Sequence, residues 1–315
     1  MKINKKLKWA LVLSGGGAKG FAHIGVLKTF SEMGFPEPSM IIGTSMGAIV
    51  GGLYACGMSP EEINRFALEE FKLEEHLDSF VFKINGIVGR VFQTGQIIGN
   101  LATRPGIDSG QMILQLLEKL TGGKTFDDTR IPFRCNAVDL ITGREVVLKT
   151  GSVARAIRAS ISFPAFFEPF QEGDDYLVDG GLANNMPVFI PRLEGIPRVL
   201  AVDVGGFQIL PMESMKTGPK IIYRSMEVAL HNIRHTEEPR ADLTIRASGD
   251  ETPFSFSRIQ SIIDLGAQAV QENRKAVNAF FGSGIGAYFA RAKYRECGIC
   301  STEPAADSGK EGLFA

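Results

Sequence analysis

Residues 40–56 read MIIGTSMGAIVGGLYAC, and this stretch predicts the fold around it. The apolar run MIIG is typical of a buried strand, and the Ala- and Gly-rich run after it indicates a helix packed closely on a sheet. Between them, residues 43–47 match the G-x-S-x-G pattern in the strand, turn and helix setting that gives this motif its meaning. We therefore expect Ser45 to project from the end of a strand, with Gly43 and Gly47 relieving the crowding around it.

A second strand and loop precede this motif. The apolar run WALVLS at residues 9–14 leads through GGGAKG at residues 15–20 into the helical pattern FAHIGVLKTF. The G-x-G-x-x-G spacing of the loop is that of dinucleotide-binding proteins, with Glu32 and Glu37 as candidate ribose partners. The same glycines equally allow backbone N–H groups to stabilise an oxyanion beside a nucleophile. The loop alone leaves both chemistries open.

A nucleophilic serine needs a base, and the usual base is a histidine held by a carboxylate. The histidines of this chain are poor candidates. His76 lies in a surface-helix pattern, His23 lies among apolar helix positions, and His231 and His235 have the spacing of a metal pair without a third ligand. Asp179, in YLVDGGLANNMP, ends a predicted strand before two glycines that permit close backbone approach. The sequence thus offers Asp179 as the base, with an ordinary acidic turn as the alternative.

The rest of the chain alternates between strands and helices. IPFRCNAVDL and REVVLK predict a hairpin, SVARAIRAS predicts a short helix that begins at Ser152, and residues 59–80 predict a surface helix. YLV, RVLAVDV and ADLTIR predict three further strands, and residues 257–281 predict one long helix. We expect a flexible tail over residues 282–315. Without a repeat or a clear linker, the pattern favours one α/β domain.

Composition restricts the class of protein. The 315 residues are 44% hydrophobic, which is enough to bury a large core. Lys and Arg number 34 against 35 Asp and Glu, so charge makes no case for a nucleic-acid partner. No apolar segment approaches the roughly 20 residues that cross a bilayer. The four cysteines lack the pattern of a secreted disulfide framework, and the single CxxC of Cys297 and Cys300 is a poor zinc site. We expect a cytoplasmic protein, with peripheral membrane contact left open.

The motifs GGGAKG, GTSMG and DGG, in this order, resemble those of the patatin-like phospholipase family. The similarity extends from Lys8 to Phe281 and includes FRCNAVDLITGREVVLKTG and AIRASISFPAFFEPF. It implies a three-layer α/β/α fold with a central, mostly parallel sheet and a Ser-Asp dyad without a catalytic histidine. Position by position, it assigns Ser45 as the nucleophile and Asp179 as the base. It places the oxyanion hole at Gly15, Gly16, Gly17, Lys19, Gly20 and Met46, and motif support at Gly43, Gly47, Gly180 and Gly181.

The resemblance also implies an activity. It predicts a serine lipid acyl hydrolase that cleaves carboxyl esters of phospholipids or lysophospholipids through an acyl-enzyme, with no cofactor and no metal. Its partner is then a lipid or fatty-acyl ester. Ser160 and Pro164 match a family block near the site, where we expect a supporting role. Two alternatives stay open: a nucleotide-binding oxidoreductase that uses the glycine loop, and a catalytically silent scaffold of the same fold.

Residues 81–110 form the least regular part of the pattern. Their apolar residues are too closely interspersed with glycine for a regular core helix and too apolar for a free surface loop. One interpretation is a mobile cap or membrane-facing wall over an acyl groove. The other is an irregular insertion packed on the sheet. The residues concerned are Ile84, Ile87, Val88, Val91, Phe92, Ile97 and Ile98.

Overall fold

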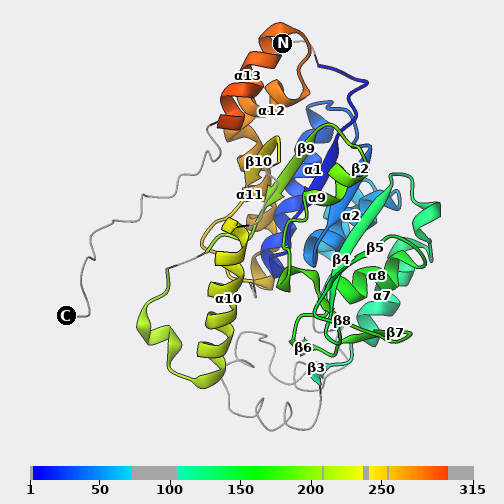
Figure 1. The fold of residues 1–315 in the computed structure, drawn as a ribbon, viewed down its shortest axis with the longest axis vertical. Helices are drawn as coiled ribbons and strands as arrows, with labels where there is room; N and C mark the ends of the chain where they lie inside the picture. Colours follow the sequence, from blue (N-terminus) through cyan, green and yellow to red (C-terminus); the bar gives the residue numbers. More distant parts are fainter. Residues whose placement is uncertain are drawn as a thin grey trace.

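Short apolar runs along the chain form the strands of a central sheet (Figure 1). A computed structural model of the protein describes residues 3–72, 75, 105–207, 209–236, 241–253 and 255–296. Within these residues the sheet has eight strands in the order β10-β9-β1-β2-β4-β8-β7, with β5 paired to β4. The strands are β1 (Ala10–Leu13), β2 (Met40–Gly43), β4 (Phe133–Asp139), β5 (Glu145–Leu148), β7 (Phe170–Glu172), β8 (Asp175–Asp179), β9 (Val199–Asp203) and β10 (Leu243–Arg246).

The centre of the sheet is parallel and buried on both faces. β1 pairs in parallel with β2 and β9, β9 with β10, and β2 with β4, whereas β5, β7 and β8 join through antiparallel pairs. Alternate residues of β1 pack in opposite directions, with Leu11 and Leu13 in one hydrophobic cluster and Ala10 and Val12 in another. A sheet that is apolar on both faces requires helices on both sides.

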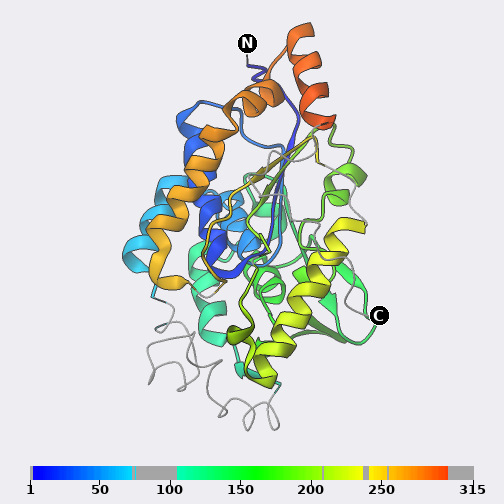
Figure 2. The ribbon, with the colours of Figure 1, turned by 90° about the vertical axis from the view of Figure 1, so that its left-hand side faces the viewer.

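Helices cover the two faces, which makes three layers. Figure 2 shows α1 and α11 on one side of the sheet and α9 and α10 on the other. This arrangement confirms the predicted α/β/α fold with a mostly parallel sheet. The helices are α1 (Ala22–Glu32), α2 (Met46–Ala55), α3 (Pro60–Arg65), α7 (Gln111–Thr121), α8 (Val153–Ser160), α9 (Phe189–Leu193), α10 (Gly218–Thr236), α11 (Ile259–Glu272), α12 (Arg274–Phe281) and α13 (Ile285–Glu296).

Short helical turns and a second small sheet complete the described part of the chain. The strands of the small sheet are β3 (Gly106–Asp108) and β6 (Ala165–Phe167), which pair in parallel. The turns are η1 (Gly17–Phe21), η2 (Phe66–Glu70), η4 (Phe126–Asp128), η5 (Gly180–Leu182), η6 (Met212–Met215) and η7 (Phe256–Arg258).

Side-chain caps start two of the predicted helices. At α3, Ser59 Oγ accepts from Glu62 N at 3.2 Å and Glu62 Oε2 accepts from Ser59 N at 2.7 Å, a reciprocal capping box. At α8, Ser152 Oγ accepts from Arg155 N at 3.4 Å. Both helices therefore begin where the sequence predicts, although α3 ends at Arg65 and continues only as far as Glu70 in η2.

The end of the described chain differs from the sequence prediction in two ways. The long helix predicted over 257–281 is divided at Asn273, whose Nδ2 donates to Ala269 O at 2.8 Å and so competes with the helix backbone. Residues 285–296 form α13, where we expected a tail from residue 282. This helix is held because Ala287 is buried and Arg291 Nη1 donates to Gly282 O at 3.0 Å. Residues 297–315, with Cys297 and Cys300, lie outside the described residues.

The predicted cap over 81–110 is described only from residue 105. Here Gly106–Asp108 is buried strand β3, so this end of the range belongs to the folded body. Residues 81–104, with the apolar residues on which the cap interpretation depends, lie outside the described residues. In the described part, none of the helices combines the length and the apolar character needed to cross a membrane.

Strand register brings the glycine loop and the G-x-S-x-G turn to one edge of the sheet. Leu13 of β1 lies opposite Gly43 of β2 and Val202 of β9, and all three strands run in the same direction. The loops that follow them therefore leave the sheet at the same level. These loops are GGGAKG, the Ser45 turn and the segment that begins at Val204.

The same register explains how an antiparallel strand delivers Asp179. Cys135 of β4 lies opposite Gly43, and Ala137, two residues further along β4, lies opposite Asp179 of β8. Because β2 and β4 are parallel, the position two residues after Gly43 lies at the level of Ala137, and therefore of Asp179. That position is Ser45, so strand register places the two predicted catalytic residues at the same level of the sheet.

Candidate active site

Ser45 occupies a strained turn between β2 and α2. Its backbone has φ 52° and ψ −122°, and Ala165 is the other non-glycine residue with positive φ in the described chain. Such a conformation costs free energy and persists only where the surroundings impose it. The two glycines of the motif have another purpose: a Cβ at Gly43 would collide with Gly47 O, and a Cβ at Gly47 would collide with Leu13 O. They allow α2 to begin directly against the ends of β1 and β2.

The end of α8 and the residues directly after it support both predicted catalytic residues. Ser160 Oγ accepts a hydrogen bond of 3.0 Å from Ser45 N. Two residues later, Ser162 O accepts from Asp179 N at 3.0 Å. Ser160 and Ser162 are both fully buried. The predicted supporting role of Ser160 therefore has a direct geometric basis in the backbone of Ser45.

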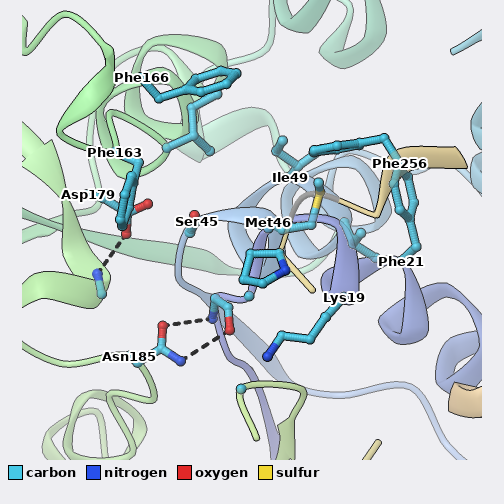
Figure 3. Close-up of a pocket in the computed structure, with 18 of the residues that line it drawn as sticks. Lys19, Phe21, Ser45, Met46, Ile49, Phe163, Phe166, Asp179, Asn185 and Phe256 are labelled. Atoms are coloured by element: carbon cyan, nitrogen blue, oxygen red, sulfur yellow. Dashed lines mark hydrogen bonds between the residues drawn. The ribbon is translucent and has the colours of Figure 1, made fainter. Parts of the chain in front are cut away.

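Asp179 ends β8 with its carboxyl group buried at the edge of the site (Figure 3). Burial raises the pKa of Asp179 from 3.8 to about 6, while hydrogen bonds from the Ser45 side chain and from Gly181 N oppose the increase. The Gly181 N–H donates to Asp179 Oδ1 at 2.8 Å, as an N-cap does. A Cβ at Gly180 would collide with Asn136, at 2.5 Å from its backbone and amide oxygens. The two glycines of DGG thus allow the carboxyl group to sit in this turn.

The backbone N–H groups of the glycine loop differ in whether they have a hydrogen-bond acceptor within the fold. Gly15 N donates to Asn185 Oδ1 at 3.1 Å and Gly15 O accepts from Asn185 Nδ2 at 3.1 Å, so one amide side chain holds both sides of this residue (Figure 3). Lys19 N donates to Gly16 O at 3.2 Å. The N–H groups of Gly15 and Lys19 therefore have acceptors within the fold.

Three backbone N–H groups near Ser45 have no acceptor among the described residues. They belong to Gly16, Gly17 and Met46. Met46 is the first residue of α2, where an N–H group has no intrahelical partner and the helix dipole favours negative charge. Gly20 acts differently, because a Cβ there would collide with the Met46 side chain. Lys19 Nζ donates to Gly206 O at 3.2 Å and ties the loop to the segment after β9.

A cavity of about 260 Å³ contains Ser45 and Asp179 among its lining residues. Apolar side chains form most of its wall, and Figure 3 shows several of them beside Ser45. They come from α1, α2, α3, α7, η2 and the segment around β6. Examples are Ile24, Ile49, Leu53, Ile63, Phe66, Leu117, Phe163 and Phe166. The cavity can accommodate a long apolar group whose polar end faces Ser45.

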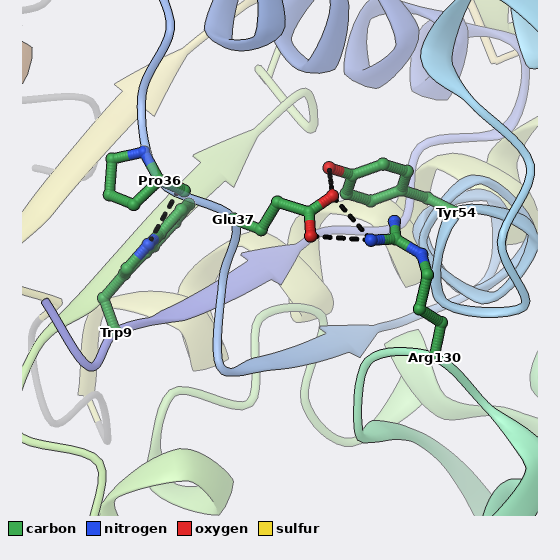
Figure 4. A network of polar contacts seen from close by, with 5 residues as sticks. All are labelled: Trp9, Pro36, Glu37, Tyr54 and Arg130. Carbon is green, nitrogen blue, oxygen red and sulfur yellow. Dashed lines mark hydrogen bonds and ion pairs between the residues drawn. The ribbon is translucent and has the colours of Figure 1, made fainter. Parts of the chain in front are cut away.

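The carboxylates expected for a dinucleotide site lie elsewhere. Glu37 accepts from Arg130 Nη1 at 2.6 Å with both of its oxygens, and from Tyr54 OH at 3.2 Å (Figure 4). Glu32 ends α1, about 16 Å along the helix from the end nearest the glycine loop. Neither residue lines the cavity. The G-x-G-x-x-G spacing therefore has no ribose-binding carboxylate from either predicted position.

The histidines that the structure describes serve other contacts. His23 is fully buried, its Nε2 lies 2.8 Å from Ser14 O, and burial lowers its pKa to about 4. Since a carbonyl only accepts, Nε2 carries the proton of this neutral ring. His231 lines the cavity and stacks on Phe207, with 4.5 Å between ring centroids. His76 and the side chain of His235 lie outside the described residues, and within those residues no cluster of ligands suits a metal ion.

Two asparagines of the site were not predicted from the sequence. Asn185 holds Gly15, and Asn136 connects the Ser45 turn to the DGG loop: it accepts from Thr44 Oγ1 at 2.7 Å and donates to Asn184 O at 2.8 Å. Asn136 is fully buried within the strand FRCNAVD. A polar amide in an otherwise apolar strand needs buried hydrogen-bond partners, and this feature of FRCNAVD could have pointed to Asn136. Asn185 carries no comparable local signal.

Together the fold and site define an α/β protein with a serine in a strained turn between a strand and a helix, a setting typical of serine hydrolases. A family model described as patatin-like phospholipase matches residues 11–191. The chain belongs to the patatin-like phospholipase family.

Curated relatives agree with this assignment. An uncharacterized NTE family protein of Mycobacterium tuberculosis is 28% identical over 288 residues, which cover 83% of this chain and 45% of that protein. Lysophospholipase NTE1 of Saccharomyces cerevisiae is 31% identical over 197 residues, with 62% of this chain and 11% of the yeast protein covered. Patatin-like phospholipase domain-containing protein 6 of Mus musculus is 32% identical over 198 residues, with 62% and 13% covered. The chain spans less than half the length of these relatives.

Solved structures with a similar arrangement share little sequence with this chain. VipD from Legionella pneumophila gives a TM-score of 0.49 at 15% identity, covering 89% of this chain and 70% of VipD.

Proposed function

We propose that this protein is a serine lipid acyl hydrolase that cleaves carboxyl esters of phospholipids or lysophospholipids. The observation that carries the proposal is the position of Ser45 and Asp179 in the wall of a largely apolar cavity. The membership of the patatin-like phospholipase family supports lipid hydrolysis. The name of the yeast relative, a lysophospholipase, supports a lysophospholipid as one substrate class.

In the first step, Ser45 Oγ attacks the ester carbonyl carbon while Asp179 accepts the hydroxyl proton. A carboxylate is a weak base for an alcohol, but burial raises the pKa of Asp179 to about 6 and brings its proton affinity closer to that of a histidine. Ser45 also stands at the start of α2, where the helix dipole favours a developing negative charge.

The tetrahedral intermediate places a negative charge on the former carbonyl oxygen. The N–H groups of Gly16, Gly17 and Met46 are the donors that we assign to this oxyanion, since they have no acceptor in the described chain. Preorganised donors of this kind contribute most when the charge forms away from water. Their positions depend on two anchors, the Asn185 clamp on Gly15 and the Ser160 contact with Ser45.

Collapse of the intermediate breaks the ester C–O bond, and the leaving alkoxide takes the proton from Asp179. The acyl group stays on Ser45 Oγ. Water then attacks the acyl carbon, Asp179 accepts a proton from the water, and breakdown returns this proton to Ser45 as the fatty acid leaves. No further co-reactant is needed for this balance.

The apolar wall provides the binding free energy for the acyl chain. Each methylene that leaves water contributes about 0.8 kcal/mol, so contacts with residues such as Ile49, Leu53 and Phe166 favour long chains over short ones.

The decisive experiment combines labelling with a substrate panel. A fluorophosphonate probe should modify Ser45 alone, as mapped by peptide mass spectrometry, and heat-denatured protein should remain unlabelled. A panel of phosphatidylcholine, lysophosphatidylcholine, triacylglycerol and short p-nitrophenyl esters should then give the fastest turnover on the first two, with slower cleavage of the short esters. Labelling without turnover on any ester would favour the silent scaffold. Nicotinamide or flavin fluorescence in the purified protein would favour the oxidoreductase.

A further inference from the structure

One face of helix α10 turns Arg224 and Glu227 toward the protein. Arg224 Nη1 pairs with Glu227 Oε2 at 3.1 Å, and the Arg224 guanidinium lies 3.9 Å from the centre of the Phe207 ring. His231, two turns later, stacks on the same ring. Glu227 and His231 also line the cavity that contains Ser45, together with Met226 and Leu230. This face of α10 is therefore one wall of the candidate active site.

The opposite face of α10 is apolar and exposed to solvent. Its residues recur at helical spacing, and we call them the α10 stripe: Ile221, Ile222, Ser225, Val228 and Ala229. The side chains of Ile221, Ile222 and Val228 are 51%, 73% and 39% exposed. The one hydroxyl in the stripe is satisfied internally, because Ser225 Oγ donates to Ile221 O at 2.9 Å. A surface helix normally has the reverse polarity, with apolar residues inward.

The apolar surface continues into the segment before α10. Ile209 is 93% exposed and Met212 is 79% exposed. This segment leaves β9 at the edge of the sheet where Ser45 lies. Exposed apolar side chains thus occur both on the outer face of α10 and in the segment that leads into it, where η6 packs against α10. Exposed apolar surface that gathers in one region marks an interaction site.

We propose that the α10 stripe, with Ile209 and Met212, docks the protein on a lipid surface so that substrate enters beside α10. This inference rests on the proposed lipid hydrolysis. A helix with an outward apolar face is suited to the boundary between headgroups and acyl chains. Lys216 and Lys220 lie near its first turn, and in the sequence of residues 209–220 they are accompanied by one acidic residue, Glu213, a balance that suits anionic headgroups.

The size of the patch argues for a lipid surface over a second copy of the chain. A stable protein interface engages about 20 to 30 residues on each side. The stripe and its two neighbours comprise seven residues on one helix face and the adjoining turn. A membrane needs no matching shape, so a narrow apolar stripe suffices there.

The test measures binding to vesicles made of ether-linked phosphatidylcholine, with or without ether-linked phosphatidylglycerol. Ether lipids cannot be hydrolysed at the acyl position, so binding is separated from turnover. The test variant is Ile221→Ser/Ile222→Ser/Val228→Ser. The matched control is Ile285→Ser/Tyr288→Ser/Phe289→Ser on α13, whose side chains are 78%, 65% and 66% exposed. Figure 1 shows α13 at the opposite end of the molecule from α10.

We expect the α10 variant to bind vesicles at least about tenfold more weakly than the unaltered protein, because interfacial affinity scales with buried apolar area. The α13 control should bind vesicles as tightly as the unaltered protein. Lys216→Ala/Lys220→Ala should lose only the increase in affinity that phosphatidylglycerol gives. All three variants should still cleave a short soluble ester.

Equal vesicle binding by the α10 variant and the unaltered protein would overturn the proposal, as would equal losses in the α10 and α13 variants. A dimer in sedimentation that the α10 substitutions dissociate would assign the stripe to a second copy and also overturn it. Vesicle binding with no ester cleavage would reject the hydrolase while leaving the docking surface standing.

Discussion

Ser160 Oγ accepts the backbone N–H of Ser45 at 3.0 Å, across 115 residues of sequence. This contact satisfies the donor of a residue with φ 52°, a conformation that needs support from its surroundings. Because Ser162 O also accepts from Asp179 N, the end of α8 fixes the backbones of both proposed catalytic residues. The separation of the proposed nucleophile and the proposed base therefore depends on this segment.

Ser160→Ala should lower kcat by about tenfold, because loss of a positioning contact misaligns the attacking atom. The partly buried N–H of Ser45 also loses its partner, which should reduce the free energy of unfolding by about 1 kcal/mol or more. Ser152→Ala is the matched control, since it removes the N-cap of the same helix at a similar cost of about 1 kcal/mol. Steady-state kinetics and denaturant unfolding should show a kcat loss only in Ser160→Ala. A similar kcat loss in both variants would reduce Ser160 to a helix-stabilising residue.

Asn185→Ala should lower kcat by about tenfold or more with little change in KM, because the clamp on Gly15 orders the proposed oxyanion donors that follow it. Asn184→Ala removes a hydrogen bond in the same loop, from Met186 N, without touching Gly15. Its kcat should stay near that of the unaltered protein. Kinetics on a short soluble ester provide the comparison. If Asn185→Ala and Asn184→Ala change kcat equally, the hydrogen bonds from Asn185 to Gly15 have no specific role in catalysis.

Ser45→Ala and Asp179→Asn should each reduce kcat by several powers of ten, and the double variant should be little worse than either, because the two residues act as a unit. His231→Ala tests the triad alternative, since His231 is a histidine in the wall of the cavity. It should retain most of the activity. Undiminished turnover in folded Ser45→Ala protein, or a His231→Ala variant as inactive as Ser45→Ala, would end the dyad mechanism.

The pH dependence of kcat/KM should report the ionisation of Asp179. A base must be deprotonated, and burial raises the pKa of Asp179 to about 6. Activity on a neutral ester should therefore rise with pH through an apparent pKa of about 6 and level off above it. The residual activity of Asp179→Asn should lack this step. A profile in the unaltered protein that falls over this interval would contradict Asp179 as the base.

The same carboxyl group should make folding stability depend on pH. Its pKa is raised from 3.8 to about 6 on folding, so its stabilising contribution is complete below 3.8 and is lost as pH rises through 6. At pH 8 the loss is up to about 3 kcal/mol. Asp179→Asn, which keeps an acceptor for Gly181 N, should therefore be more stable than the unaltered protein at pH 8. Near pH 4 the difference should disappear. Denaturant unfolding of both proteins at the two pH values measures this, and a less stable Asn variant at pH 8 would refute it.

Local patterns predicted much of the framework because the forces behind them are local. The apolar runs before GGGAKG and GTSMG became parallel neighbours, and Ser59 and Ser152 cap the helices that follow them. Where side chains compete with the backbone, the pattern misled: Asn273 divides a helix that apolar spacing predicts as continuous. The tail was placed too early because α13 is stabilised by contacts with α12, which spacing within residues 285–296 does not reveal.

The sequence by itself determined the elements and the candidate residues: a G-x-S-x-G turn after a strand, a glycine loop, and Asp179 ahead of two glycines. Only the tertiary structure decided how these parts meet. Strand register sets Asp179 at the level of Ser45, and Asn185 reaches Gly15 across 170 residues. The tertiary structure likewise decides which face of α10 is exposed, because Arg224 and His231 on the other face contact Phe207. Such contacts join segments far apart in the chain, and their geometry depends on how the strands align, which no local pattern encodes.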